Sequence, residues 1–235
     1  MVLQDQVALI TGANRGIGRA IALTFASQGA RIAVTGRSAE RCQPVVAEIA
    51  AMDGEAQAFT LDVTRDDEVS TAIQSVLSMW GKIDILVNSA GIIQYHTPVW
   101  ATTVEAWDTM MQVNLRGTFI CCHAVIPHMK ERGSGVILNI GSSAARMADD
   151  DFGPYTATKW GVVGYTTSLA RSLRPHGIRV NGLNPGWVDT DMSREFDAAG
   201  ASEWSTPAEI AQAALFLAAQ APRDMTGQFL DIFGS

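Results

Sequence analysis

Short apolar runs alternate along this chain with longer segments whose apolar residues recur every three or four positions. The short runs are typical of buried strands, and the periodic segments are typical of helices that bury one face. The apolar runs predict strands at residues 7–10, 31–35, 56–61, 83–87, 136–140, 178–183 and 228–233. The periodic segments predict helices at residues 17–27, 39–52, 64–80, 104–131, 155–173 and 206–217.

The regular alternation of strands and helices predicts an α/β fold. It indicates a parallel sheet with helices on both faces, and right-handed crossovers make this a doubly wound, Rossmann-like sheet. The longest predicted helix carries apolar positions at Trp107, Met111, Leu115, Phe119, Cys122, Val125 and Met129. No linker or change in composition divides residues 1–235, so we expect a single domain.

Composition and charge narrow the class of protein. The 235 residues are 47% hydrophobic and 17% charged, with a net charge of −7 and no basic tract, which argues against a nucleic-acid partner. No apolar run approaches the length of a membrane span, and the N-terminus does not resemble a signal peptide. Cys42, Cys121 and Cys122 have no metal-ligand spacing, and buried free thiols fit a cytoplasmic location. His123 and His128 are five residues apart, which is poor metal spacing, so we expect no metal site.

Tyr155 and Lys159 are four residues apart in a predicted helix, which places both side chains on one face. Free tyrosine has a pKa of about 10, and a neighbouring positive charge favours the phenolate and lowers this pKa. The pair is therefore a candidate general acid and base for a carbonyl or an alcohol. The same spacing also fits an amphipathic tyrosine beside a solvated lysine, so the surrounding residues must decide.

A glycine-rich stretch joins the first predicted strand to its helix. Glycines there let the backbone approach a phosphate, while the helix N-terminus offers N–H donors. The spacing is Gly-x-x-x-Gly-x-Gly rather than the Gly-x-Gly-x-x-Gly of the dinucleotide fingerprint, and a structural turn is the alternative. The candidate cofactor residues in this stretch are Gly12, Asn14, Arg15, Gly16, Ile17 and Gly18.

The end of the second predicted strand bears on the choice of cofactor. An NAD-binding unit places an acidic residue there to bind the ribose, whereas this strand ends in Gly36 and Arg37. Arg37 can form a bidentate contact with a 2′-phosphate, with Arg15 nearby. The sequence therefore favours NADP(H), although a solvated Arg37 is the alternative interpretation.

Further unusual residues follow the other predicted strands. In an open α/β sheet, ligands bind at the carboxyl ends of the strands, so residues at these positions should meet. They are Asp62-Val63, Asn88-Ser89-Ala90-Gly91, Gly141-Ser142-Ser143 and the segment from Pro185 to Thr190.

Together these motifs resemble the short-chain dehydrogenase/reductase family, in its ordinary-length branch, over nearly the whole chain. The resemblance rests on the glycine motif at 12–18, the Asn88–Gly91 sequence, Asn114, Ser142 thirteen residues before Tyr155, the Tyr155 and Lys159 pair, and Pro185-Gly186 with Thr190.

The resemblance implies a role for each matching residue. It makes Tyr155 the acid and base, and the Ser142 hydroxyl the partner of the carbonyl oxygen. It implies that Lys159 holds the nicotinamide ribose and lowers the pKa of Tyr155, and that Asn114 positions a water in a proton relay. The other cofactor contacts that it implies are Asp62, Val63, Asn88, Ala90, Gly91, Pro185, Gly186, Val188 and Thr190.

Two departures from the family pattern concern the cofactor loop and the substrate. Ser89 replaces the second asparagine of the usual Asn-Asn-Ala-Gly sequence. Only residues 191–206 separate Thr190 from Pro207, a short segment where relatives place the substrate lid. Because a short lid encloses only a limited ligand, we expect a rather open site of modest selectivity that favours compact neutral carbonyls or alcohols over long acyl carriers. The alternative is that Phe196 and Trp204 only anchor the segment on the core or on a neighbouring subunit.

We therefore expect an NADP(H)-dependent oxidoreductase that interconverts a carbonyl and a secondary alcohol of a small molecule. A 3-oxoacyl thioester reductase and a small ketone, sugar or polyol dehydrogenase both remain open. The acidic run 149–151 disfavours anionic substrates if it faces the pocket, and is otherwise a solvated loop. A non-catalytic dinucleotide-sensing protein is the alternative from another class. The resemblance also implies a homo-oligomer, a tetramer or a dimer.

Overall fold

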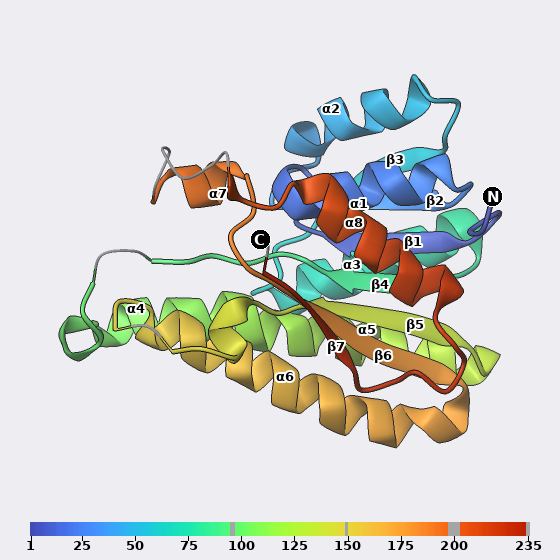
Figure 1. Ribbon diagram of the computed structural model, residues 1–235. Helices are drawn as coiled ribbons and strands as arrows, with labels where there is room; N and C mark the ends of the chain where they lie inside the picture. Colours follow the sequence, from blue (N-terminus) through green and yellow to red (C-terminus); the bar gives the residue numbers. More distant parts are fainter. Residues whose placement is uncertain (95–96, 149, 197–202, 234–235) are drawn as a thin grey trace.

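A computed structural model describes residues 1–94, 97–148, 150–196 and 203–233. Seven strands form one parallel sheet in the order β3-β2-β1-β4-β5-β6-β7, as Figure 1 shows. The strands are β1 (Val7–Thr11), β2 (Arg31–Gly36), β3 (Ala56–Thr60), β4 (Ile85–Asn88), β5 (Gly135–Ile140), β6 (Ile178–Pro185) and β7 (Phe229–Ile232). All seven predicted strands are confirmed, with ends that shift by one or two residues.

Helices cover both faces of this sheet, as the alternating pattern predicts. The α-helices are α1 (Gly16–Ser27), α2 (Ala39–Ala50), α3 (Asp66–Trp80), α4 (Val104–Met110), α5 (Gly117–Arg132), α6 (Gly153–Leu173), α7 (Asp191–Arg194) and α8 (Pro207–Leu215). Shorter turns are η1 (Val99–Ala101), η2 (Met111–Arg116), η3 (Ser143–Ala145), η4 (Arg174–His176) and η6 (Phe216–Gln220). One buried apolar cluster joins α1, α2 and α8 to the sheet, and a second joins α3, α5 and α6. The doubly wound α/β fold is therefore confirmed.

The strand order reverses between β1 and β4, which run side by side at the centre of the sheet. Their ends are in register, with Thr11 opposite Asn88. At such a reversal the crossover connections leave toward opposite faces, which opens a crevice at the carboxyl ends of the two strands. The fold thus places a binding crevice beside the glycine-rich stretch.

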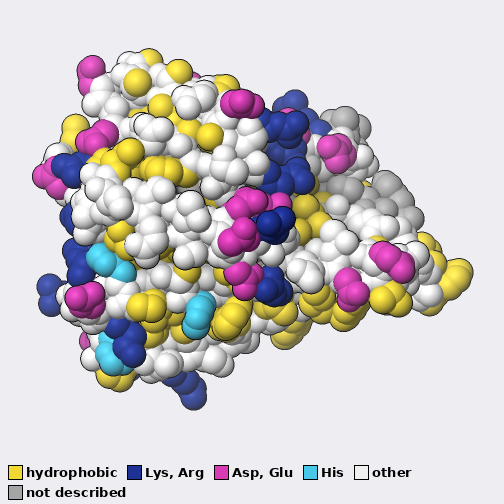
Figure 2. Space-filling model, turned by 180° about the vertical axis from the view of Figure 1, so that it is seen from behind, with side chains coloured by type: hydrophobic (Ala, Val, Ile, Leu, Met, Phe, Trp, Pro, Cys, Tyr) yellow, Lys and Arg dark blue, Asp and Glu magenta, His cyan; other side chains and the backbone are white. Residues whose placement is uncertain are grey.

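The long predicted helix over 104–131 is present, but it is interrupted and it buries only part of its apolar stripe. The segment η2 between α4 and α5 is π-helical. Cys122, Val125 and Met129 lie in the core, whereas Trp107 is 41% exposed and Phe119 is 47% exposed. Figure 2 shows hydrophobic side chains along the lower right edge of the molecule, toward the tip at which α4 lies. Part of the apolar stripe therefore packs into the core, and the rest lies on an outer face of the molecule.

Candidate active site

A single cavity of about 520 Å³ lies at the carboxyl ends of the strands and collects most of the predicted site residues. The predicted residues that line it are Gly12, Asn14, Arg15, Gly16, Ile17, Gly18, Arg37, Asp62, Val63, Ala90, Gly91, Ser142, Tyr155, Lys159, Pro185, Gly186, Val188 and Thr190. The residues that follow the carboxyl ends of the strands therefore lie around one cavity, as we expected from the sequence.

One wall of the cavity is built to let an anion approach the backbone. Gly12 has a φ of +64°, and a Cβ at this position would lie 2.9 Å from Ala90 Cα, so only glycine fits. The structure describes all of α1, and no side chain caps its N-terminus and no acidic residue lies in its first turn. Its first N–H groups and the positive end of its dipole are thus left for a phosphate. These features fit the pyrophosphate of a dinucleotide cofactor.

Three arginines line the cavity near the ends of β1 and β2. Arg15 precedes α1, Arg37 follows β2, and Arg41 lies in the first turn of α2. Arg15 also forms a 3.9 Å ion pair with Asp191 at the start of α7, in which both side chains are more than half exposed. Three guanidinium groups within one lining suit a phosphate on the adenosine ribose better than a free hydroxyl.

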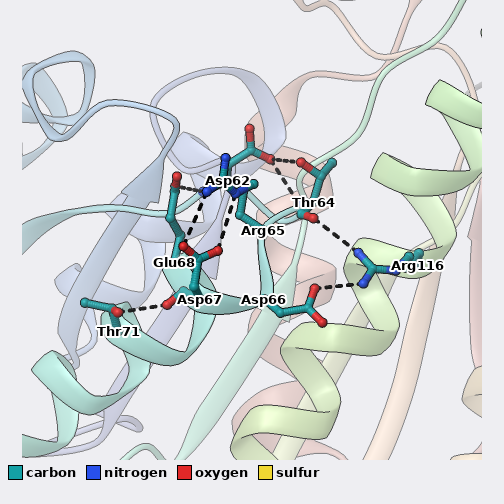
Figure 3. A network of polar contacts seen from close by, with 8 residues as sticks. All are labelled: Asp62, Thr64, Arg65, Asp66, Asp67, Glu68, Thr71 and Arg116. Carbon is teal, nitrogen blue, oxygen red and sulfur yellow. Dashed lines mark hydrogen bonds and ion pairs between the residues drawn. The ribbon is translucent and has the colours of Figure 1, made fainter.

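Asp62, the expected adenine contact, is held by the turn between β3 and α3 (Figure 3). Its Oδ1 accepts hydrogen bonds from the Thr64 backbone N at 2.9 Å and from the Thr64 hydroxyl at 2.8 Å. Glu68 accepts from the Asp62 backbone N at 3.0 Å. Arg116 of η2 donates to the Thr64 carbonyl at 3.2 Å and to Asp66 at 2.8 Å. This wall of the cavity is therefore fixed from both α3 and the long interrupted helix.

Ser142, Tyr155 and Lys159 line the cavity together. The Ser142 hydroxyl accepts a hydrogen bond from Ala144 N at 3.1 Å as the cap of η3, and it is also hydrogen-bonded to Tyr155. Lys159 Nζ donates to the Ile140 carbonyl at 2.9 Å and lies 5.3 Å from the centroid of the Tyr155 ring. The three groups thus surround a space in which a carbonyl oxygen can meet two hydroxyl donors.

Burial dominates the ionisation of this group of residues. It raises the pKa of Tyr155, and the hydrogen bond with Ser142 opposes that rise. It lowers the pKa of Lys159 to about 8. The net lowering of the Tyr155 pKa that we expected beside Lys159 is therefore not found, because burial of the phenol is the largest influence and raises this pKa.

Asn88 and Asn114 are absent from the described residues that line the cavity. Asn88 is buried and donates to Asn139 Oδ1 at 2.8 Å, which ties β4 to β5. Asn114 is 2% exposed and binds both backbone groups of Ile92, each at 2.8 Å. Asn114 therefore holds the backbone at Ile92 beside the cavity, while Asn88 bonds to side chains in the core, and the proton-relay role of Asn114 stays a prediction.

Several lining residues were not assigned a site role from the sequence: Gly36, Arg41, Leu61, Thr64, Ser89, Ile92, Val113, Ile140, Gly141, Asp191 and Met192. Arg41 could have been found from the sequence, since it follows Arg37 by four positions at the start of a predicted helix. Most of the others are apolar or small residues beside a predicted site residue, and their contribution is shape.

The two large aromatic residues of the 191–206 segment pack on one tryptophan. Phe196 stacks on Trp187 with ring centroids 4.8 Å apart, and Trp204 stacks on Trp187 at 5.3 Å. Neither Phe196 nor Trp204 is among the described residues that line the cavity. This arrangement favours the anchoring interpretation of the two aromatic residues. Residues 197–202 of the expected lid lie outside the described residues.

The acidic run and the metal expectation can be compared with the structure in part. Asp150 is exposed, Asp151 is partly buried, and neither is among the described residues of the cavity lining, while residue 149 lies outside the described residues. The described residues hold no cluster of three or more His, Cys, Asp or Glu suited to a metal ion. All three cysteines are buried free thiols, as expected. No helix in the described part of the chain has the length and apolar character needed to cross a membrane.

Comparisons with known proteins agree with this geometry. A family model described as short chain dehydrogenase matches residues 6–200. The chain is 38% identical to a 3-oxoacyl-[acyl-carrier-protein] reductase from Synechocystis sp., over 99% of this chain and 97% of that protein. It is also 38% identical to a D-threitol dehydrogenase from Mycolicibacterium smegmatis, over 99% of this chain and 93% of that protein. The crystal structure of a short-chain type dehydrogenase/reductase from Mycobacterium marinum superimposes with a TM-score of 0.93 at 31% identity, covering 99% of this chain and 95% of that one.

Proposed function

Since the chain belongs to the short-chain dehydrogenase/reductase family, we propose that it is an NADP(H)-dependent oxidoreductase that interconverts a carbonyl and a secondary alcohol. The observation that carries the proposal is one cavity with Ser142, Tyr155 and Lys159 in its lining together with three arginines and an uncapped helix N-terminus. The nicotinamide cofactor supplies or accepts the hydride when bound. The protein supplies the proton and the orientation.

In the direction of reduction, Tyr155 donates its phenolic proton to the substrate oxygen as hydride reaches the carbon. In the structure the Ser142 hydroxyl accepts from Ala144 N and is hydrogen-bonded to Tyr155; when substrate binds, Ser142 donates its proton to the same substrate oxygen instead. Two donors aimed at one oxygen stabilise the negative charge that develops there. Lys159 holds the ribose and keeps a positive charge beside the phenolate that Tyr155 becomes.

The 2′-phosphate of NADP(H) is assigned to Arg37 and Arg41, with Arg15 beside them. Charge-assisted contacts from guanidinium to phosphate are the strong class of hydrogen bond. The end of β2 offers Gly36 and Arg37 where an NAD-binding unit has an acidic residue, and the structure brings Arg41 to the same lining.

The proposed substrate class is a compact ketone or secondary alcohol. Relatives at the same identity are named for a thioester substrate and for a polyol, so similarity alone favours neither. The short 191–206 segment supports the smaller substrate, because a short lid encloses a limited ligand. A 3-oxoacyl thioester reductase is the second candidate, supported by several relatives of that name.

A spectrophotometric assay of NADPH oxidation with a panel of ketones and 3-oxoacyl thioesters tests the proposal. Tyr155→Phe removes the proton donor with little change in volume, so turnover should fall by about 10²- to 10⁴-fold while NADPH affinity stays near wild type. Wild-type turnover in this variant would remove Tyr155 from the chemistry. Binding of NADPH without turnover of any carbonyl or alcohol would favour the sensing protein instead.

We also propose a domain organisation, a cellular location and an assembly for the whole chain. Residues 1–235 form a single domain with 191–206 as its lid, and the chain acts in the cytoplasm, where its three free thiols stay reduced. It assembles as a dimer or tetramer through the outer apolar face of α4, α5 and α6, where Trp107, Phe119 and Trp160 are 41%, 47% and 51% exposed.

A further inference from the structure

The backbone of Ser142 is held by a side chain from the neighbouring strand. Asn184 lies near the carboxyl end of β6 and is fully buried. Its Oδ1 accepts a hydrogen bond from Ser142 N at 3.2 Å. A Cβ on Gly141 would lie 2.1 Å from the same oxygen, so glycine at 141 leaves the space that the amide occupies. Asn184 thereby fixes the turn that carries the Ser142 hydroxyl.

The orientation of the Asn184 amide is fixed in turn by Asp231 of β7. Asn184 Nδ2 donates to Asp231 Oδ1 at 2.8 Å. A carboxylate only accepts hydrogen bonds, so the amide nitrogen must face Asp231 and the amide oxygen must face Ser142. Arg146 Nε donates to both oxygens of Asp231, at 3.1 and 3.2 Å. The network therefore links Ser142 to Arg146 across η3 and holds both ends of this short turn.

A second contact from β7 supports the same turn. Phe229 and Asp231 are two residues apart in the strand and share one face. A Cβ on Gly182 would lie 2.1 Å from the Phe229 ring, and one on Gly141 would lie 3.2 Å from it. The ring therefore packs closely against the two glycines, directly beside the amide of Asn184. The last strand of the sheet thus supports the Ser142 turn through both an apolar and a polar contact.

We propose that Asn184 and Asp231 are positioning residues for Ser142, an inference that rests on the proposed function. Neither is among the described residues that line the cavity, so they act on the reaction through the Ser142 backbone. Misplacement of a reacting group by about 1 Å can cost about 10²-fold in rate. Loss of the network should therefore lower kcat and leave intact the part of the cofactor site that lies at the ends of β1 and β2, where the arginines and the α1 N-terminus lie.

The test compares kcat and NADPH affinity in Asn184→Ala, Asp231→Ala and Ser142→Ala, and in the Asn184→Ala/Ser142→Ala double variant. Asn184→Ala and Asp231→Ala should each lower kcat by about 10- to 100-fold and leave the NADPH Kd within about twofold. In the Ser142→Ala background, Asn184→Ala should cause no further loss, because the group that it positions is gone. Asp231→Asn keeps an acceptor for Asn184 and should retain most of the turnover. Asp224→Ala, which breaks an exposed ion pair with Arg174, is the matched control.

Full additivity in the double variant would overturn the proposal, and so would an unchanged kcat in both single variants. If Asn184→Ala does not fold, Asn184→Ser is tested instead, because the serine hydroxyl is too short to reach both the Ser142 backbone N and Asp231. Failure of the proposed function shows separately, as wild-type protein that turns over no carbonyl or alcohol. Hydrogen exchange of residues 141–146 then tests the support alone: it should rise in Asn184→Ala, and unchanged exchange would overturn the proposal.

Discussion

Lys159 is a cation buried among the proposed catalytic residues, at 6% exposure, and its burial makes stability depend on pH. Burial lowers its pKa from 10.5 to about 8. Below about pH 8 the side chain is charged in the folded and the unfolded chain, and the cost of burying the charge is fully present. Between this pH and 10.5 the folded protein has released a proton that the unfolded chain still holds, so stability from this group rises with pH.

Lys159→Met should therefore be more stable relative to wild type at about pH 7 than at about pH 10.5. The difference in free energy of unfolding between Lys159→Met and wild type should be smaller by about 3 kcal/mol at about pH 10.5 than at about pH 7, at about 1.4 kcal/mol per pKa unit. Urea unfolding at the two pH values measures it. Lys130→Met, at an exposed lysine of α5, is the control and should show the same difference from wild type at both pH values. If the difference between Lys159→Met and wild type is also the same at both pH values, burial of the Lys159 charge does not destabilise the folded protein.

At the scale of elements, the proposed preference for NADP(H) rests on the junction of β2 and α2. Gly36→Asp is a natural way to introduce an NAD-type carboxylate, but a Cβ on Gly36 would lie 3.1 Å from Cys42 Sγ. Substitutions that remove a guanidinium group avoid this crowding, and they can be made at Arg37 and at Arg41.

Arg37→Ala and Arg41→Ala should each lower kcat/KM with NADPH and leave kcat/KM with NADH within a few-fold. Charge-assisted contacts are worth roughly 1.5–3 kcal/mol, which corresponds to roughly 10- to 150-fold. Arg223→Ala, at an exposed arginine outside the described lining, serves as the control. Equal wild-type kcat/KM values with the two cofactors, or losses that are equal for both, would refute the assignment of a 2′-phosphate site.

The strands and helices could be predicted because burial imposes a period on the sequence. The strands β1, β2 and β4 are wholly or almost wholly buried, and they stand out as apolar runs between turns. The π-helical turn η2 could not be predicted in this way. It contains Asn114, which binds Ile92 twenty-two residues earlier in the chain, and a local apolar period carries no record of such a contact.

Residues of the cavity lining could be predicted where the expected chemistry requires a particular residue type at a strand end or at a fixed helical spacing. Arg15, Arg37, Ser142, Tyr155 and Lys159 all reach the cavity on this basis. Residues that contribute through long-range contacts were not predictable. Asn184 and Asp231 are 47 residues apart and meet only because β6 and β7 are neighbours. Likewise, the stacking of Phe196 and Trp204 on Trp187 joins residues that are distant in the sequence, and no local pattern records it.

For the whole molecule, the distribution of exposed apolar side chains bears on assembly. Trp107 of α4, Phe119 of α5 and Trp160 of α6 are all more than 40% exposed, although they belong to helices whose other faces are buried. Trp100, just before α4, is 88% exposed. Exposed large apolar side chains on these helices favour the proposed interface, because a homo-oligomer that pairs the helices would cover them.

Light scattering should give a mass that is two or four times the 25.1 kDa of one chain. Phe119→Glu and Trp160→Glu should each shift the distribution toward smaller species, because a carboxylate placed in an apolar interface loses hydration without gaining a partner. Met52→Glu is the matched control, since Met52 is exposed to the same 47% as Phe119 but lies just beyond the end of α2, on the other side of the sheet. A wild-type monomer at every concentration tested would contradict the assembly. An oligomer that is weakened by Met52→Glu and unaffected by Phe119→Glu and Trp160→Glu would place the interface on the α1, α2 and α8 side instead.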